Sequence, residues 1–342
     1  MSARIGWYVH HHGRGHLSRM LAIAPHLDAE ICCFSSLPRP DDLPEHCSWT
    51  LLDRDDDLRP GATDPRSADP EAGGLLHWAP LGHAGHRARL ATMVASVAET
   101  PVDAFVVDVS VEVALLVRLL GIRTVVIAQP GTRNDAAHEL GYRAATTIVA
   151  PWPEALLDPP HLAAVKGKTV FTGGISRFEG RAHTGLVPED RSERTVVLLG
   201  SRGGSGVSAS AIADASTSSG RSWRVLGATP DDAWSADPWH ELTTAGVVVA
   251  WAGQNSVADL AAANAAAVIV PQERPFGEQV ETALAVKRAG LAIVATEWPP
   301  ADAWPELIDR ATRLRPDWSR WEVHGAAARA AAAIEATARA RA

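Results

Sequence analysis

Three glycine-bearing turns in this 342-residue sequence combine residue types that bind anions and move protons. Each turn follows an apolar run and precedes a helical pattern. Glycine lets the backbone approach a ligand closely, and the first N–H groups of a helix have no partner within the helix. Those N–H groups carry partial positive charge, so they suit a phosphate or diphosphate. We therefore expect the chemistry of this chain where strands end and helices begin.

The first turn reads Gly13-Arg14-Gly15-His16-Leu17-Ser18-Arg19 and lacks the third glycine of the dinucleotide fingerprint. His16 is the best candidate for a general base, because the reference pKa of histidine lies near neutral pH. Asp108, at the end of the apolar run 104–108, is our first choice for the carboxylate that orients it. The alternatives are a helix-start histidine in a tight turn and an aspartate that only caps a helix.

The second turn, 199–206, holds Gly203, Gly204 and Ser205, and its backbone can form a nest for a diphosphate. It is no Walker A loop, because no Lys-Ser or Lys-Thr pair follows. A flexible surface loop is the alternative.

The third turn reads Trp251-Ala252-Gly253-Gln254-Asn255-Ser256, and we expect a helix to open at Ser256. Asp259 lies one turn into that helix, where its carboxylate can accept two ribose hydroxyls. The alternative is a capping box, in which Asp259 bonds back to the N–H of Ser256.

Further polar residues follow another strand pattern, in the segment Arg133-Asn134-Asp135-Ala136-Ala137-His138. Asp135 and His138 form a reserve acid–base pair or bind the acceptor, and we expect Arg133 and Arg19 to bind the acceptor as well.

No metal site is expected. Successive residues of an extended chain point to opposite faces, so His10, His11 and His12 cannot all bind one ion. The run Asp53-Arg54-Asp55-Asp56-Asp57 looks like a metal-binding D-x-D motif, but we interpret it as a solvated loop. No cofactor is expected either.

The elements that must position these residues alternate between strand and helix, which predicts parallel sheets with both faces covered. Strands are expected at 4–9, 30–35, 104–108, 124–128, 146–149, 195–199, 223–226, 247–250 and 267–270. Helices are expected at 13–27, 84–99 and 111–120, from about 208, from 256 and around 278. The length favours two domains, 1–165 and 166–321, with a final helix at about 322–342 that can pack back on the first.

This pattern resembles the MurG-like inverting glycosyltransferases, whose two Rossmann-like domains face each other across a cleft in the GT-B fold. Those enzymes pair a G-x-G-H-type turn with a later segment G-x-x-[ST]-x-x-[ED] and an acidic or amide pair that opens a donor helix. Here the matching residues are Gly13, Gly15 and His16, then Gly253, Ser256 and Asp259, then Glu278 and Gln279. Asp259 stands where the usual residue is Glu.

The resemblance implies an α/β fold of the GT-B type and transfer from a nucleotide-diphosphate sugar to an acceptor hydroxyl, by metal-independent inverting displacement. The donor is expected to be a UDP sugar, with UDP-N-acetylglucosamine first. Gly203, Gly204 and Ser205 would face the diphosphate, Asp259 the ribose, and Glu278 and Gln279 the sugar. Gly15, Gly253, Asn255 and Ser256 complete the expected donor site. A UDP-N-acetylglucosamine 2-epimerase-type isomerase is the alternative.

Composition limits the partners. A formal net charge of −8 argues against nucleic acid and allows at most weak peripheral contact with a membrane. The sequence shows no secretory leader and no 18-residue apolar run, so we expect a cytoplasmic protein with reduced cysteines. It leaves the acceptor and the oligomeric state open.

Overall fold

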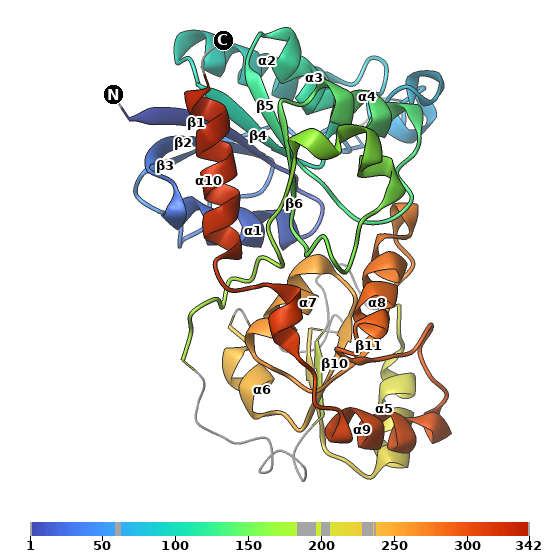
Figure 1. Cartoon of the computed structure of the whole chain (residues 1–342). Coiled ribbons are helices and arrows are strands. Elements are labelled where there is room, and N and C mark those ends of the chain that lie inside the picture. The colour runs from blue at the N-terminus through green and yellow to red at the C-terminus, as the bar shows by residue number, and fades with distance from the viewer. Residues whose placement is uncertain are drawn as a thin grey trace.

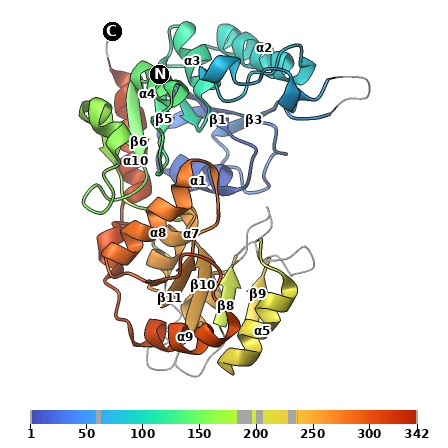
Figure 2. The same ribbon diagram turned by 90° about the vertical axis from the view of Figure 1, so that its right-hand side faces the viewer.

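The computed structural model describes residues 2–58, 63–182, 196–199, 206–227, 235 and 237–340. Within them, two parallel sheets lie one above the other in Figure 1 and again in the rotated view of Figure 2. The seven-stranded sheet has the order β3-β2-β1-β4-β5-β6-β7, and the five-stranded sheet has the order β12-β11-β10-β8-β9. The predicted α/β architecture with two Rossmann-like sheets is confirmed.

The N-terminal sheet is covered on both faces, as a parallel sheet requires. Ile5, Trp7 and Val9 of β1 pack against α1 and α10, whereas Tyr8 packs against helices of the opposite layer. The strands are β1 Ala3–Val9, β2 Ala29–Ser35, β3 Cys47–Leu51, β4 Ala104–Asp108, β5 Arg123–Ile127, β6 Thr147–Ala150 and β7 Thr169–Phe171. Its helices are α1 Gly15–Ile23, α2 Ala84–Glu99, α3 Val111–Leu119 and α4 Ala136–Ala144.

The C-terminal sheet repeats this arrangement. Val248 and Ala250 of β10 pack toward α7 and α8, and Val247 and Val249 pack toward α5 and α9. The strands are β8 Val196–Leu199, β9 Trp223–Leu226, β10 Val247–Trp251, β11 Ala267–Val270 and β12 Ile293–Val294. The helices are α5 Ala209–Ser219, α6 Trp239–Thr244, α7 Gln254–Ala262, α8 Glu278–Arg288 and α9 Trp304–Arg313.

Several elements were missed from the sequence, namely β3, β7, β12, α4, α6 and α9. β7 lies in residues assigned above to the second domain, yet it pairs with β6 at the edge of the N-terminal sheet. Helix α7 begins at Gln254, two residues before the predicted start.

The final helix, α10 (Ala326–Arg339), returns to the N-terminal sheet (Figure 1). Its buried face consists mainly of alanine, and Ala326, Ala327, Ala330, Ala331 and Ile334 join the core formed by β1 and α1. Small side chains let a helix approach a sheet closely. Thr337 and Thr147 also share a hydroxyl hydrogen bond of 2.8 Å between α10 and β6.

Among the helices of the described residues, none combines the length and the apolar character needed to cross a bilayer.

Candidate active site between the two sheets

His16 and Asp108 meet at one edge of the N-terminal sheet. His16 is the second residue of α1, and Asp108 ends β4, which pairs with β1. Nδ1 of His16 lies 3.0 Å from Oδ1 of Asp108, whose side chain is fully buried, whereas the His16 side chain is 13% exposed. The structure thus places a histidine that solvent can reach against an inaccessible carboxylate.

Arg19 holds the same carboxylate from the other side. Its Nη1 donates to both oxygens of Asp108, at 2.9 and 3.0 Å. Burial alone would raise the pKa of Asp108, but the Arg19 guanidinium and then His16 hold that pKa below its usual value. Arg19 is itself buried, so its guanidinium faces Asp108 rather than an acceptor, contrary to our expectation from the sequence.

Asp108 does not cap α3. That role belongs to Ser110, whose hydroxyl accepts from the N–H of Val113 at 3.2 Å. Val109, between them, has a φ of 68°, which is unfavourable for a β-branched residue and costs about 1–3 kcal/mol. The strained turn leaves Asp108 available to His16 and Arg19.

The N-termini of α1 and α7 face each other across the junction of the two domains. Nδ2 of Asn255 donates to the carbonyl oxygen of Gly15 at 2.8 Å. Oε1 of Gln254 accepts from Nη2 of Arg19 at 3.0 Å. Gly253 is the N-cap of α7 and makes no side-chain cap, and Ser256 lies in the first turn. Sequence reasoning gave no role to Gln254, although it lies inside the third glycine turn.

Asp259 is buried one turn further along α7 and does not form a capping box. Oδ1 accepts from the Ser176 hydroxyl at 2.7 Å, and Nε of Arg177 lies 3.5 Å from Oδ2. Burial raises the pKa of Asp259 to about 6, against the lowering effect of Arg177 and Ser176. The carboxylate therefore contacts the segment that joins the two sheets.

A second contact between the domains surrounds Glu278. Oε2 of Glu278 accepts from Nη2 of Arg133 at 3.2 Å, and the Arg133 guanidinium stacks 4.8 Å from the centre of the Phe276 ring. The carbonyl oxygen of Phe276 accepts from the N–H of Thr132 at 2.7 Å. Gln279 is buried, and its Oε1 accepts from the Gln272 backbone at 2.9 Å.

Asp135 bridges two histidines beside this contact. Its oxygens lie 2.5 Å from Nδ1 of His138 and 2.9 Å from Nε2 of His77, and it caps α4. Burial lowers the pKa of His138 to about 4 despite Asp135. Nη1 of Arg133 lies 2.8 Å from Nε2 of His138. Sequence reasoning missed His77, which comes from a distant loop.

A small pocket with a cavity volume of about 30 Å³ adjoins these residues. His77, Arg133 and His138 supply part of its wall, and Val111, Ala114 and Tyr142 supply an apolar part. Gly203, Gly204 and Ser205 lie outside the described residues, so their predicted role remains a prediction.

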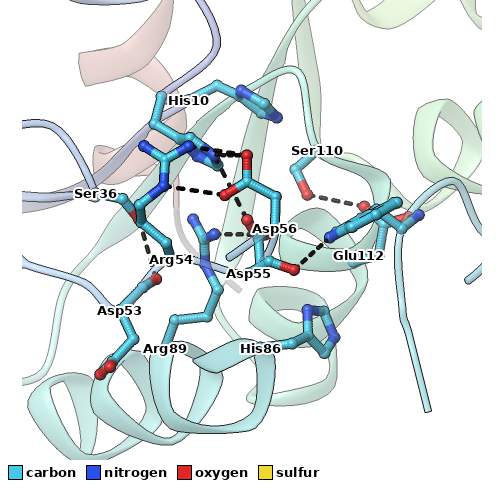
Figure 3. A network of polar contacts seen from close by, with 12 residues as sticks. His10, Ser36, Asp53, Arg54, Asp55, Asp56, His86, Arg89, Ser110 and Glu112 are labelled. Carbon is cyan, nitrogen blue, oxygen red and sulfur yellow. Dashed lines mark hydrogen bonds and ion pairs between the residues drawn. The ribbon is translucent and has the colours of Figure 1, made fainter. Parts of the chain in front are cut away.

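Asp55 is buried and Asp56 is half-buried, which corrects the interpretation of the 53–57 run as a solvated loop at these two residues, whereas Asp53 and Asp57 are exposed. Figure 3 shows the contacts of the run. Arg89 of α2 is buried, forms an ion pair with Asp55 and donates to the Tyr8 hydroxyl at 2.7 Å. Asp56 lies 3.1 Å from Nε2 of His12. This run is therefore fixed against β1 and α2.

The fold of the chain is similar to the folds of several solved structures. The chain superposes on the glycotransferase of kitacinnamycin with a TM-score of 0.72 at 15% identity, over 98% of this chain and 99% of that one. MurG of Acinetobacter baumannii gives 0.63 at 15% identity, over 97% and 99%. UGT71G1 of Medicago truncatula, complexed with UDP-glucose, gives 0.67 at 13% identity, over 98% of both chains. The chain has the GT-B fold.

No protein-family model and no curated protein sequence matches this chain. In the GT-B frame, the His16–Asp108 pair belongs to the N-terminal domain, and Gly253, Asn255, Ser256 and Asp259 belong to the C-terminal domain. Of the residues named from the sequence, Gly15 and Asn255 thus meet across the junction, and Arg19 meets Gln254 there.

Proposed function

We propose that this chain transfers a sugar from a nucleoside-diphosphate donor to an acceptor hydroxyl, with inversion at the anomeric carbon. The observation that supports this most directly is the 3.0 Å contact between His16 and the buried Asp108, opposite the N-terminus of α7. The GT-B fold agrees with it. A UDP sugar is our first donor, and UDP-N-acetylglucosamine comes first among UDP sugars because of the MurG-like motifs.

His16 is the proposed base. Because Nδ1 faces Asp108, Nε2 is the nitrogen that takes the proton of the acceptor hydroxyl as it attacks. Asp108 fixes the ring and stabilises the imidazolium that forms. Arg19 and Gln254 are positioning residues, because they hold Asp108 and connect it to the first turn of α7.

The leaving diphosphate needs stabilisation of its negative charge. We assign this to the backbone amides at Gly253, Asn255 and Ser256 and in the turn 203–205, each helix-terminal interaction contributing about 0.3–2 kcal/mol. No metal ion is assigned to the diphosphate. Gly15 lies at the opposing helix start, where its carbonyl oxygen binds Asn255.

We assign recognition of the ribose and of the sugar of the donor to residues of α7 and α8. Asp259 is assigned to the ribose. To bind it, the carboxylate would replace its contact with Ser176 or Arg177 by one with a ribose hydroxyl. Glu278 and Gln279 are assigned to the sugar hydroxyls at the start of α8.

The acceptor is assigned to the pocket beside α4. His138 and Asp135 would contact its polar part, and Arg133 would hold Glu278 in place across the junction. The apolar wall, with Val111 and Tyr142, favours an acceptor that carries a hydrocarbon or ring portion.

The test uses UDP-N-acetylglucosamine and a panel of phenolic and sugar acceptors, with the product's anomeric configuration read by proton NMR. We expect inversion, and His16→Gln should lower kcat by about 10²–10⁴. UDP binding, followed by thermal shift, should stay within a few-fold. His240→Gln, at an exposed histidine of α6, is the matched control.

Full transfer by His16→Gln would remove His16 from the mechanism, and a product with retained configuration would overturn the proposal. An epimerised donor in the absence of acceptor would instead support the 2-epimerase alternative.

A further inference from the structure

A second group of chemically active side chains lies beside the proposed transfer site. The chain bends after His10, and this bend brings His11 and His12 next to each other with ring centres 4.3 Å apart. Asp56, from the loop after β3, lies against both. Three successive histidines of an extended chain cannot bind one ion, but the bend lets His11 and His12 face the same one.

Nε2 of His11 is 3.5 Å from Oδ1 of Asp55 and 3.6 Å from Oδ2 of Asp56. Both distances exceed those of ordinary hydrogen bonds. The ring is 1% exposed, and neither of its nitrogens has a hydrogen-bond partner among the described residues. A buried imidazole thus faces two carboxylates without bonding either.

The same distances suit ligands that share an ion. Ligand atoms about 2.0–2.1 Å from a tetrahedral Zn²⁺ lie about 3.3 Å from each other. His11, His12 and Asp56 each offer one ligand atom within 4.8 Å of the other two. Oδ2 of Asp56 lies 3.6 Å from Nε2 of His11 and 3.1 Å from Nε2 of His12. His12 is 63% exposed, so its ring can rotate to shorten the longest of these distances.

Both carboxylates also bind an arginine, and metal-binding carboxylates commonly have such a further partner. Arg54 donates to Asp56 through Nε at 3.1 Å and Nη2 at 2.8 Å. Arg89 pairs with Asp55 and is itself buried (Figure 3). These arginines orient the carboxylates and balance their charge before any ion arrives.

The other cluster of this composition differs in the feature that matters. In His77, Asp135 and His138, both histidines are hydrogen-bonded to the carboxylate, at 2.9 and 2.5 Å. In the cluster at Asp56 only His12 is, at 3.1 Å, and the buried His11 is not. His138 also contacts Arg133 through Nε2.

We propose that His11, His12 and Asp56 bind a divalent transition metal of the Zn²⁺ class, with the fourth position open to solvent beside His12. The ion would connect two segments of the chain. One is the turn between β1 and His16, and the other is the loop that follows β3. Two imidazoles and one carboxylate form a common donor set for Zn²⁺. The site takes no step in glycosyl transfer and does not depend on the proposed function.

The test measures Zn²⁺ and Co²⁺ binding to the full chain, stripped with a chelator and free of any polyhistidine tag. We expect one ion per chain by equilibrium dialysis, and a higher Tm when Zn²⁺ is bound. His12→Gln and Asp56→Asn should each weaken binding by at least about tenfold. His26→Gln, at an exposed histidine outside both clusters, should bind as the wild type does.

His12 is exposed, so its variant tests the site without disturbing the core; circular dichroism verifies that both variants fold. Failure of the wild-type chain to bind either ion would overturn the proposal. So would unchanged binding in His12→Gln and Asp56→Asn, or loss of binding only in His138→Gln, which would place the ion in the other cluster.

Discussion

Among single residues, Asp108 keeps its charge through a neighbour, because Arg19 donates to both of its oxygens in a region that water does not reach. Arg19→Met removes the guanidinium from the buried carboxylate and leaves it only His16, so we expect a loss of about 3–5 kcal/mol in the free energy of unfolding. Urea unfolding at pH 8 measures it. Arg143→Met, at an exposed ion pair of α4, is the control and should change stability by less than about 1 kcal/mol.

Asp259 gives a pH-dependent prediction. Its pKa of about 6 lies above the ordinary 3.8, so the folded protein binds more protons than the unfolded chain between these values. The stability due to this group is therefore full below pH 4 and is lost as the pH rises through 6. Asp259→Asn does not titrate, and its gain over the wild type should grow to about 3 kcal/mol near pH 7.

Chemical unfolding of both proteins at pH 4, 5.5 and 7.5 measures this difference, and a difference that does not change with pH would contradict it. UDP binding should weaken in the same variant if Asp259 holds the ribose.

Single residues were predictable where a general rule of parallel sheets applies. The pairing of His16 with Asp108 follows from strand ends that share one edge. The capping box at Ser256, the alternative role of Asp259, was wrong. The Ser-x-x-Asp pattern does not determine which residue starts the helix, and α7 starts at Gln254. The burial of Asp55 depends on Arg89, 34 positions away, which no local pattern reveals.

At the level of elements, the junction between the domains depends on the close approach of two backbones. A Cβ atom at Gly131 would lie 2.2 Å from the carbonyl oxygen of Phe276, and φ at Gly131 is +99°. We expect Gly131→Ala to separate the turn after β5 from the loop before α8, which lowers both Tm and affinity for a donor that spans both domains.

The control is Gly167→Ala, since a Cβ there meets no atom within 4 Å and φ is not positive. Differential scanning calorimetry and thermal shift with UDP-N-acetylglucosamine compare the two. Equal behaviour of both variants would mean that this contact is dispensable.

Long, strongly patterned elements were predicted well, and α2 matches its expected range. The missed strands are short, and β7 has three residues in a segment rich in proline and glycine. Their strand conformation comes from pairing with a neighbour in the sheet rather than from their own pattern.

For the whole molecule, α10 completes the core of the N-terminal domain. Ala330 is fully buried there, so Ala330→Leu overfills the space and should cost about 1–3 kcal/mol. Calorimetry should show a Tm lower by several degrees. Ala332→Leu, on the exposed side of the same helix, should leave Tm within about 1 °C. A larger loss at Ala332 would show that the helix is turned differently.

The two-domain GT-B arrangement was predictable, because alternation of strands and helices fixes the layers, and the motifs matched in order along the chain. The identity of the donor, the identity of the acceptor and the cluster of His11, His12 and Asp56 were not predictable, because they depend on side chains that come together from distant loops.

The return of α10 also sets an order of events during synthesis. A ribosome releases the chain from its first residue, and domains usually fold in that order. Here α1 covers part of one apolar side of the first sheet, and the rest stays uncovered until residues 326–339 emerge, after all the strands of the second sheet. The domain that is translated first is thus the last to be finished, and a nascent chain stalled short of α10 would offer that side to chaperones.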